Sequence, residues 1–584
     1  MTLFHRKKIN MLGVKKTALE QARGRLVILS ACFVMAYVIV VARAADLSVI
    51  QGALKQGEEV SYYKAPEQEQ KIRADIIDRN GVILARSLKT SSLYADPALV
   101  QDPESLAKEL DKIFPSFSYG ALLQKLQSKK RFVWIKRNIN PEEQSKILYM
   151  GHPALNFQED MRRIYPQESL VSHMVGGTGI DGQGLSGIEA GFNTLLSEKE
   201  KPLQLTIDVR LQHVLKREIQ STIKSFGAKG GAGMIMDVSN GEILAATSLP
   251  DFDPHQYKNA KDDQIFNRLT LGVYELGSSF KIFSTAAQLE KNKGNLAQRY
   301  DVREPIEVGR FKISDYHPEK RVLTLPEVFI HSSNIGSALM GENVGTQELQ
   351  NFYKDIGLFN KPEFEIQEMG SPIIPSPWRE VNTLTASYGH GIAVSPLQLV
   401  KATASIINGG VLVSPTLIKQ DKLPKKIFKK SQLRRDVQVV SPQTSHRMRQ
   451  LMRLVVTNGT GKMAEVDGFL VGGKTGTAEK PGKGGYNKKR LISSFLGAFP
   501  MDDPKYVVFV MVDEPQGTKE SYGYATGGWV GAPTVARVIS GMASVMGLSP
   551  HNTAKPIEAS LVRYIKTEEQ IELERRREQK IATQ

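Results

Sequence analysis

Apolar residues are unevenly distributed along the chain, and changes in their pattern divide it into five parts. Leu26–Ala42 is an apolar run of seventeen residues in which only Ser30 is distinctly polar. Residues 46–201 mix short strand-like runs with polar helices, and RADIIDRNGVILARS alternates around Asn80-Gly81, which predicts a tight hairpin. The predicted parts are a leader (1–25), an apolar segment (26–45), a first folded domain (46–201), a larger second domain (202–550) and a charged tail (551–584).

The second domain is predicted to hold one sheet packed by helices. It opens with a short strand, Leu203–Ile207, and Asp208 can cap the amphipathic helix that follows. Two strand candidates, GAGMIMDV and EILAATSL, flank the turn Asn240-Gly241. Three more, LVGGKTGTAE, LISSFLGAF and YVVFVMVDE, follow a largely helical block, and a last helix opens at Ala532-Pro533. This two-plus-three split predicts an α/β domain with five strands in one sheet.

The amino-terminal leader is strongly basic. The chain carries a net charge of +16, and residues 1–25 contain seven Lys or Arg against one Glu. Residues 26–45 are predicted to form an uncleaved membrane anchor. Basic residues before an apolar segment keep that side of the membrane span in the cytoplasm, so everything after Arg43 is predicted to be exported. The alternative is a cleaved signal peptide, since Ala42-Arg43-Ala44 is similar to a cleavage site. The length of the apolar run favours the anchor.

Composition limits the remaining possibilities. A length of 584 residues predicts two or three domains. The single cysteine, Cys32, excludes a disulfide within the chain and a cysteine-based metal site. No nucleic-acid recognition motif accompanies the basic charge, so no nucleic-acid partner is predicted.

Candidate chemistry begins with Ser278 and Lys281 in VYELGSSFKIFSTAAQLE. The apolar pattern fits a helix beginning near Gly277, which places the serine and the lysine one turn apart on the same face. Exposed backbone N–H groups at a helix start favour developing negative charge, and the lysine can accept the serine proton if its ammonium form is destabilised. The same spacing occurs elsewhere on predicted solvated helix faces, so this pair alone is a weak signal.

Two further motifs follow in order and strengthen that signal. Ser332-Ser333-Asn334 lies in VFIHSSNIGSA, and Lys474-Thr475-Gly476-Thr477 lies on a predicted strand. The order S-x-x-K, S-x-N, K-T-G is typical of penicillin-binding proteins and class A β-lactamases. The set predicts a serine acyl-transfer site.

Each residue of the first two motifs has a predicted task in that chemistry. Ser278 attacks the carbonyl of an acyl-D-Ala-D-Ala peptide, and Lys281 activates it. Ser332 relays a proton to the leaving amine. Asn334 holds the substrate amide or the lysine in place.

The third motif is predicted to bind the substrate. Lys474 attracts the substrate carboxylate and lowers the pKa of the lysine base. Thr475 and Thr477 offer hydroxyls to that carboxylate, and Gly476 permits close approach of the ligand. The backbone N–H of Thr477 can join that of Ser278 in an oxyanion hole.

The sequence resembles the class B penicillin-binding proteins, specifically the division-type FtsI transpeptidases, over about residues 70–550. The resemblance implies a penicillin-binding/β-lactamase-like transpeptidase domain with a five-stranded antiparallel sheet flanked by helices. It also implies a non-catalytic pedestal domain before this domain and one N-terminal transmembrane helix. The blocks that carry it are RADIIDRNG, RRIYP, GLSGIEAGFN, LTIDVRLQ, NGEILAATSLPDFDPH, NRLTLGVYELGSSFK, LTASYGHGIAVSPLQLVKATASIINGG and VVTNGTGKMAEVDGFLVGGKTGTAEK.

Substrate, partners and location are implied by this resemblance alone. The family cross-links peptidoglycan stem peptides derived from lipid II during septal wall synthesis, and β-lactams acylate its serine. It works with the glycan polymerase FtsW and other divisome proteins. The family is anchored in the inner membrane with its catalytic domain in the periplasm. No metal or cofactor is implied.

Several other functions compete with this interpretation. An elongation-type class B protein would carry the same motifs, and a penicillin-binding sensor or divisome scaffold could keep them without turnover. A bifunctional class A enzyme is disfavoured because no glycosyltransferase pattern precedes the catalytic domain. A soluble β-lactamase is also disfavoured, because such a hydrolase needs neither an anchor nor a pedestal.

Three neighbouring features invite roles of their own. His331 and His390 are predicted to form structural hydrogen bonds, since a lysine base already serves the chemistry. The segment EKPGKGGYNKKR after Thr477 is either a mobile rim of the site or a solvated hairpin connection.

Overall fold

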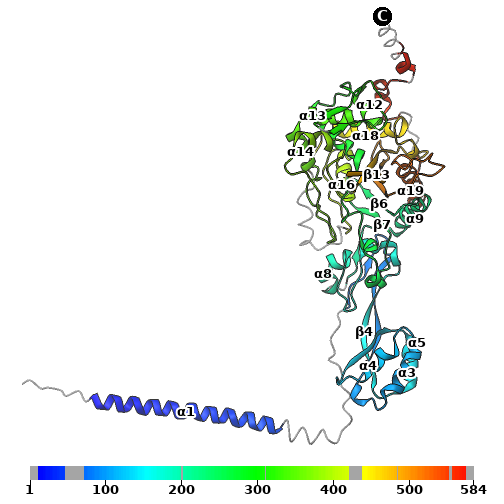
Figure 1. Ribbon diagram of the computed structural model, residues 1–584. Helices are drawn as coiled ribbons and strands as arrows, with labels where there is room; N and C mark the ends of the chain where they lie inside the picture. The colour runs from blue at the N-terminus through cyan, green and yellow to red at the C-terminus, as the bar shows by residue number, and fades with distance from the viewer. Residues whose placement is uncertain are drawn as a thin grey trace, which may run out of the picture. The chain divides into compact units, whose positions relative to one another are not determined.

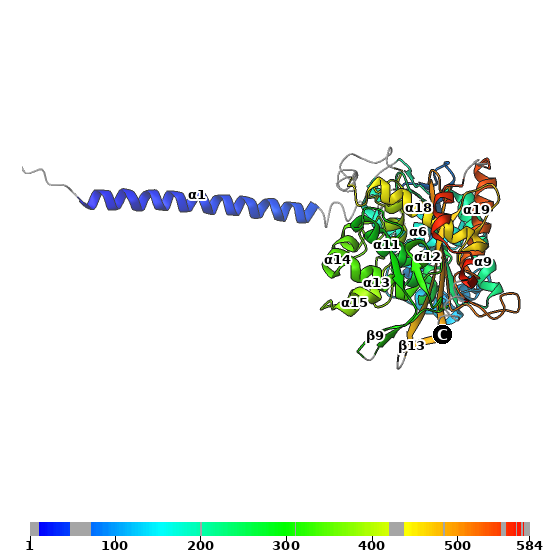
Figure 2. The same cartoon turned by 90° about the horizontal axis from the view of Figure 1, so that it is seen from above.

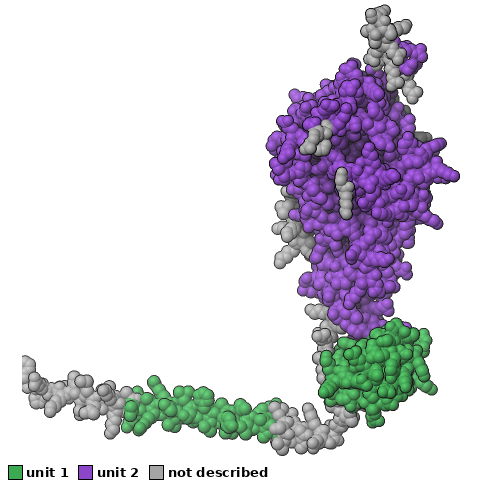
Figure 3. Space-filling model, in the orientation of Figure 1, with its two compact units in different colours: residues 1–68, 93–136, 141–158 green, residues 69–92, 137–140, 159–584 purple. Residues whose placement is uncertain are grey.

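The structure is a computed structural model whose described residues are 11–46, 72–198, 201–309, 311–419, 437–482, 485–550, 556–567, 569–573 and 576. The chain divides into two compact units (Figure 3). Unit 1 comprises residues 1–68, 93–136 and 141–158, and unit 2 comprises residues 69–92, 137–140 and 159–584.

The amino-terminal helix α1 spans Met11–Ala45 (Figure 1). Its stretch Leu19–Ala45 has 27 residues with a mean hydropathy of 2.4, and none of the apolar window is buried by the chain. A helix of that length is about 40 Å long, enough to cross a hydrocarbon core of about 30 Å. The predicted segment 26–45 therefore lies within a helix that can span a membrane by length and composition.

After α1, unit 1 contains two helices with side-chain caps at their starts. Asp102 accepts N–H bonds from Glu104 and Ser105 at the start of α3, and Ser118 caps α4. Leu106 and Leu122 are among the apolar residues that these helices bury. The helices are α3 (Pro103–Ile113), α4 (Tyr119–Leu126) and α5 (Pro141–Met150), with the short η2 (Pro97–Leu99) before them.

A small sheet forms around the hairpin predicted at Asn80-Gly81, and this prediction is confirmed. Strands β1 and β2 pair antiparallel, and the Asp78 carboxylate accepts the N–H groups of Asn80 and Val82 in the turn. The strand predicted over Leu203–Ile207 is shorter, because Thr206 bonds to Leu417 and Ile243 instead. The sheet has the order β3-β2-β1-β5 with β4 beside β2, formed by β1 (Ile76–Ile77), β2 (Ile83–Ala95), β3 (Val133–Ile139), β4 (Leu155–Ile164) and β5 (Leu203–Gln204).

The five predicted strands of the second domain form one antiparallel sheet, which confirms the two-plus-three pattern. Its order is β12-β13-β14-β6-β7. On the central strand β14, Val508 and Val510 belong to one apolar core, and Val507 and Phe509 belong to the other. This alternation buries both faces of the sheet. The strands are β6 (Gly230–Asp237), β7 (Ile243–Leu249), β12 (Gly472–Gly482), β13 (Gly485–Phe499) and β14 (Tyr506–Asp513).

Helices cover this sheet on both faces, as Figure 2 shows from above. On one face lie α9, which Asp208 caps as predicted, and α19, which begins beside the predicted Ala532-Pro533. On the other face lie α11, α16 and α18, whose apolar residues share one core with β14. These helices are α9 (Val209–Ser225), α19 (Gly531–Met546), α11 (Lys281–Lys291), α16 (Pro396–Ile407) and α18 (Pro442–Thr457).

Shorter elements complete unit 2. In the described C-terminal residues, the carbonyl of Tyr564 accepts a 2.7 Å bond from Thr324, so this segment packs on α12. The helices are α6 (Ser172–Val175), α7 (Gly187–Gly191), α8 (Asn193–Glu198), α10 (Asp262–Ile265), α12 (Leu325–Ile330), α13 (Asn334–Val344), α14 (Thr346–Asp355) and α15 (Glu380–Ala386). The short 3-10 helices are η3 (Glu168–Val171), η4 (Pro254–Asn259), η5 (Gly277–Phe280), η7 (Lys462–Ala464) and η8 (Ala559–Tyr564). Two small ribbons pair β8 (Arg299–Asp301) with β11 (Val322–Thr324) and β9 (Ile306–Val308) with β10 (Phe311–Ile313).

Candidate functional site

Ser278 and Lys281 lie where η5 passes directly into α11. Ser278 is in the 3-10 turn, and Lys281 is the first residue of the α-helix. The buried rings of Phe280 and Phe283 fix this junction in the core. Lys281 Nζ lies 2.9 Å from Ser278 Oγ, so the predicted pair is in hydrogen-bond contact.

The second motif reaches the same point from the turn between α12 and α13. Ser332 has a φ of 59°, a left-handed conformation that is strained for a residue with a side chain. Its carbonyl accepts a 2.6 Å bond from Lys281 Nζ, and its hydroxyl lies 3.1 Å from the same amine. Asn334 Oδ1 accepts a further 2.7 Å bond from it. The strained turn thus brings one residue's carbonyl and hydroxyl to a single amine.

The contacts of Lys281 fit a neutral amine. The Ser332 carbonyl and Asn334 Oδ1 can only accept, so they take two N–H bonds. A neutral amine then has one lone pair left, which can accept the proton of the Ser278 hydroxyl. Burial lowers the pKa of Lys281 to about 7, although Asp315 opposes the shift. Lys281 is therefore suited to act as a base.

Lys474 approaches from β12 and shares the Ser332 hydroxyl with Lys281. Lys474 Nζ donates a 2.8 Å bond to Ser332 Oγ, and its side chain is fully buried. Burial lowers the pKa of Lys474 well below its ordinary value, and the neighbouring Lys281 lowers it further. A hydroxyl between two buried amines can pass a proton between them and a substrate.

The rest of the third motif runs along η5 on the edge strand β12. A side-chain carbon on Gly476 would come within 2.5 Å of Ser279 Oγ and 2.8 Å of the Leu276 carbonyl, so only glycine allows this approach. Thr475 Oγ1 lies 2.9 Å from Thr460 Oγ1. Thr477 Oγ1 accepts a 3.0 Å bond from the N–H of Gly527. The predicted substrate-binding residues therefore line the strand edge beside the nucleophile.

Asp315 positions the second motif, although it belongs to none of the three motifs. Its carboxylate accepts bonds from Ser333 Oγ at 2.8 Å, from the N–H of Asn334 at 2.5 Å and from the N–H of Ile335 at 3.0 Å. It thereby caps the start of α13, the helix on which Asn334 lies. The contact joins residues about twenty positions apart, and no local motif marks it.

The neighbouring histidines contact carboxylates. His331 Nδ1 lies 3.4 Å from Glu319, and burial lowers the pKa of its imidazole. His390 Nδ1 lies 3.5 Å from Glu275. The segment after Thr477 forms a hairpin, in which β12 continues to Gly482 and β13 starts at Gly485. Residues 483 and 484 lie outside the described residues.

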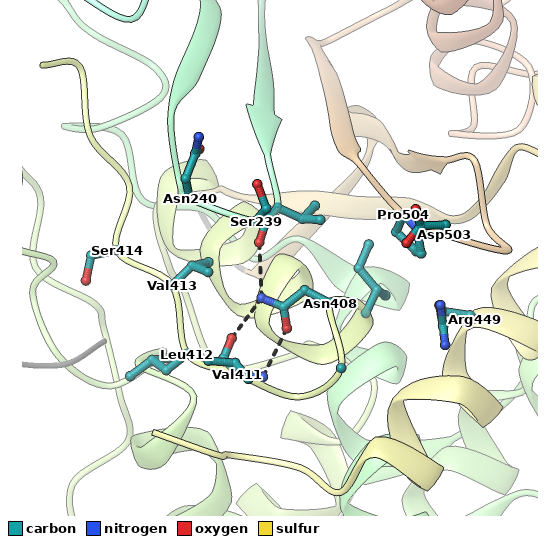
Figure 4. Close-up of a pocket in the computed structure, with 13 residues that line it drawn as sticks. Ser239, Asn240, Asn408, Val411, Leu412, Val413, Ser414, Arg449, Asp503 and Pro504 are labelled. Carbon is teal, nitrogen blue, oxygen red and sulfur yellow. Dashed lines mark hydrogen bonds between the residues drawn. The ribbon is translucent and has the colours of Figure 1, made fainter. Parts of the chain in front are cut away.

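A cavity of about 560 Å³ lies elsewhere, between the β6–β7 turn, the end of α16 and the turn before β14 (Figure 4). Asn408 lines it and donates to the carbonyls of Val238 and Val411. None of the predicted site residues lines it. Among the described residues, no group of three or more His, Cys, Asp or Glu could hold a metal ion.

Comparison with known proteins agrees with this geometry. Residues 231–539 match the penicillin binding protein transpeptidase domain, and residues 68–224 match the penicillin-binding protein dimerisation domain. A probable peptidoglycan D,D-transpeptidase FtsI of Caulobacter vibrioides is 37% identical over 489 residues, covering 82% of each chain. Stage V sporulation protein D of Bacillus subtilis is 33% identical over 522 residues, covering 82% of this chain and 79% of that protein.

A solved structure shares the fold. Penicillin binding protein 3 of Mycobacterium tuberculosis, crystallised with aztreonam, superposes with a TM-score of 0.65 at 24% identity, covering 84% of this chain and 98% of that chain. The motif order, the five-stranded sheet and these matches lead to one assignment. The chain belongs to the class B penicillin-binding proteins, with a transpeptidase domain preceded by a dimerisation domain.

Proposed function

We propose that this protein is a septal peptidoglycan D,D-transpeptidase that forms an acyl-enzyme on Ser278. The single observation that carries the proposal is the buried Lys281 amine, which contacts Ser278 Oγ, the Ser332 carbonyl and Asn334 Oδ1 together. The FtsI name of the Caulobacter relative supports a role at the septum.

In the proposed first step, neutral Lys281 takes the proton of Ser278, and Oγ attacks the carbonyl between the two terminal D-alanines. The N–H groups of Ser278 and Thr477 stabilise the oxyanion. Ser332 delivers a proton to the leaving amine, and D-alanine departs. An amine of a neighbouring strand then takes the acyl group, and β-lactams stop the enzyme at the acylated serine.

The third motif is proposed to hold the terminal carboxylate of the donor peptide. Lys474 supplies a nearby amine that donates hydrogen bonds, and Thr475 and Thr477 lie on the strand edge beside the nucleophile. Gly476 keeps the backbone close enough for the substrate to lie along β12.

Location and partners follow from the same proposal. The basic leader stays in the cytoplasm, α1 is a single-pass inner-membrane anchor, and the catalytic domain lies in the periplasm. Residues 46–201 form the non-catalytic pedestal and residues 202–550 form the catalytic domain. FtsW and other divisome proteins are the proposed partners, supported by the resemblance to division-type enzymes.

Fluorescent penicillin tests the nucleophile. Native protein is expected to label and Ser278→Ala is expected to lose labelling by about 10³-fold or more, as when other serine nucleophiles are removed. Ser105→Ala, outside the three motifs, is the matched control and should label normally. Labelling of Ser278→Ala would refute the assignment.

Two further measurements separate the alternatives. A transfer assay with a D-Ala-D-Ala donor and an amine acceptor distinguishes a transferase from a sensor, which would acylate without turnover. Depletion in the host distinguishes division from elongation: filaments support the septal role, whereas spheres contradict it.

A further inference from the structure

A carboxylate and three aromatic rings lie together beside the nucleophile, and the acylation step does not use them. Glu275 Oε1 accepts a 2.8 Å bond from the hydroxyl of Tyr486, and its Oε2 lies 3.5 Å from His390 Nδ1. The ring of His390 packs 4.6 Å from that of Tyr486 and 6.1 Å from that of Tyr388. We call these four side chains the Glu275 cluster.

Three separate segments bring the cluster to the site. Glu275 precedes Ser278 by three residues, so their Cα atoms are at most about 11 Å apart. Tyr486 lies on β13 opposite Pro481, in the extension of the hairpin that carries the third motif. His390 follows Gly389, where a side-chain carbon would come within 2.2 Å of the Gly277 carbonyl. The cluster is therefore held against the backbone of the nucleophile turn.

The cluster is open to solvent and negatively charged. The side chains of Glu275 and His390 are 19% and 43% exposed, and Tyr486 is 43% exposed. Burial and the nearby Glu275 raise the pKa of Tyr388 to about 12. Within the described part of the chain, no lysine or arginine pairs with Glu275, whereas Lys480 on the same hairpin is taken up by Asp513 and Glu514.

A partly exposed carboxylate among aromatic faces is suited to bind an ammonium group. The carboxylate accepts charge-assisted N–H bonds, and Tyr and Trp rings attract cations over their faces. Lys480, the lysine of this hairpin with a resolved ion pair, contacts Asp513 and Glu514, so a cationic ligand can approach the Glu275 carboxylate. In a transpeptidase the ligand whose primary amine reacts is the acceptor strand.

We propose that the Glu275 cluster is the subsite that binds the ammonium group of the acceptor peptide. This inference rests on the proposed function. Transfer breaks the ester C–O bond at Ser278 and forms an amide C–N bond. One amine proton returns to Ser278 Oγ, and the ammonium releases a second proton to water. Glu275 is a specificity-determining residue: it orders cationic acceptors and has no part in acylation, since Lys281 makes none of its contacts with the cluster.

The test measures partition of the acyl-enzyme with the full chain in detergent. A thioester analogue of the donor peptide acylates Ser278, and transfer is followed against hydrolysis at increasing concentrations of a peptide acceptor with a free amine. Glu275→Gln, which keeps the shape but removes the charge, should raise the half-saturating acceptor concentration about tenfold, the value of one charge-assisted bond. Penicillin labelling and hydrolysis should stay within about twofold.

Two controls make the result specific. Hydroxylamine, an uncharged nucleophile at neutral pH, should react at the same rate with the acyl-enzymes of native protein and Glu275→Gln. A general distortion of the site would instead slow its reaction with the variant. Glu342→Gln removes the same charge from an exposed position on α13 and should change nothing. Tyr486→Phe should raise the half-saturating concentration of the peptide acceptor, as Glu275→Gln does.

The outcomes separate this inference from the function on which it rests. An unchanged acceptor dependence in Glu275→Gln, with normal penicillin labelling, overturns the subsite and leaves the transpeptidase proposal intact. Equal loss with the peptide and with hydroxylamine also overturns it. If native protein forms no acyl-enzyme or transfers to no amine, the proposed function fails, and the subsite fails with it.

Discussion

At the scale of single residues, the site depends on two lysine amines that meet at one serine hydroxyl. Lys281 Nζ and Lys474 Nζ lie 3.1 Å and 2.8 Å from Ser332 Oγ, and both side chains are fully buried. Burial disfavours the charged form of both amines and lowers both pKa values, and the neighbouring Lys281 lowers the pKa of Lys474 further. Since the pKa of Lys281 is about 7, the site has a neutral base at physiological pH.

The acylation rate is expected to rise with pH through about 7, where Lys281 loses its proton. Below that pH the rate should fall about tenfold per unit, since only the neutral amine can accept the Ser278 proton. Stopped-flow acylation by a fluorescent penicillin between about pH 5.5 and 8.5 measures this. A rate constant that is flat or that falls with pH would contradict the base assignment.

The same shift has a defined sign for stability. The pKa of Lys281 is about 7 in the folded chain and 10.5 in the unfolded chain, so between these values the unfolded chain binds more protons. Stability therefore rises with pH across that window as far as this group is concerned. Below about pH 7, burial of Lys281 makes its full unfavourable contribution to folding stability. The lysine therefore serves the chemistry of the site and not the stability of the fold.

At the scale of elements, a buried ion network joins three of the blocks that carried the family resemblance. Arg73 and Arg163 each bond the Glu189 carboxylate, at 2.5 Å and 2.7 Å, and Glu189 is fully buried. Arg73 precedes β1, Arg163 lies on β4 and Glu189 lies on α7. Arg73 also bonds Asn193 and Ser197 on α8. The blocks RADIIDRNG, RRIYP and GLSGIEAGFN thus meet around one carboxylate.

Glu189→Gln is expected to destabilise the protein by about 3–5 kcal/mol, because it leaves two buried guanidinium groups without their counter-charge. Urea unfolding monitored by circular dichroism measures the change. The matched control is Glu142→Gln, which breaks an exposed pair with Lys146 and should change stability by less than about 0.5 kcal/mol. Equal effects of the two substitutions would show that the buried network contributes no more than a surface pair.

At the scale of the whole molecule, α1 carries a long apolar surface that no described part of the chain covers. Leu26, Phe33 and Ile39 are 67%, 73% and 63% exposed. Exposing such an apolar surface to water is unfavourable in free energy, and burying it in the hydrocarbon core of a bilayer removes this unfavourable term. The site residues all come from unit 2, so we expect membrane attachment and acylation to be separable properties.

Removing residues 1–45 is expected to move the protein from the membrane pellet to the supernatant without changing penicillin labelling per molecule. Fractionation after an alkaline wash, followed by labelling, measures both. Amino-terminal sequencing of the native protein distinguishes the anchor from a cleaved signal peptide. A mature chain that starts just after Ala44 would contradict the anchor.

Much of the architecture was predictable because it is encoded locally. The hairpins at Asn80-Gly81 and Asn240-Gly241, the Asp208 cap and the five strands follow from turn residues, capping and apolar period. The extra length predicted for the strand at 203–207 was wrong. Thr206 bonds to Leu417 and Ile243, which ends the pairing of this strand with β1. A local apolar pattern does not predict hydrogen bonds to such distant segments.

The sequence by itself determined the five strands, the apolar helix and the order of the three motifs, since each strand, helix and motif depends on residues close together in the chain, whereas the pairing of β14 with β6 does not. Only the tertiary structure decided which side chains meet: the left-handed turn at Ser332, the Asp315 cap, the Glu189 network and the Glu275 cluster. These contacts join residues from about twenty to more than two hundred positions apart. Their energies come from burial and geometry in the folded state, which no short stretch of sequence specifies.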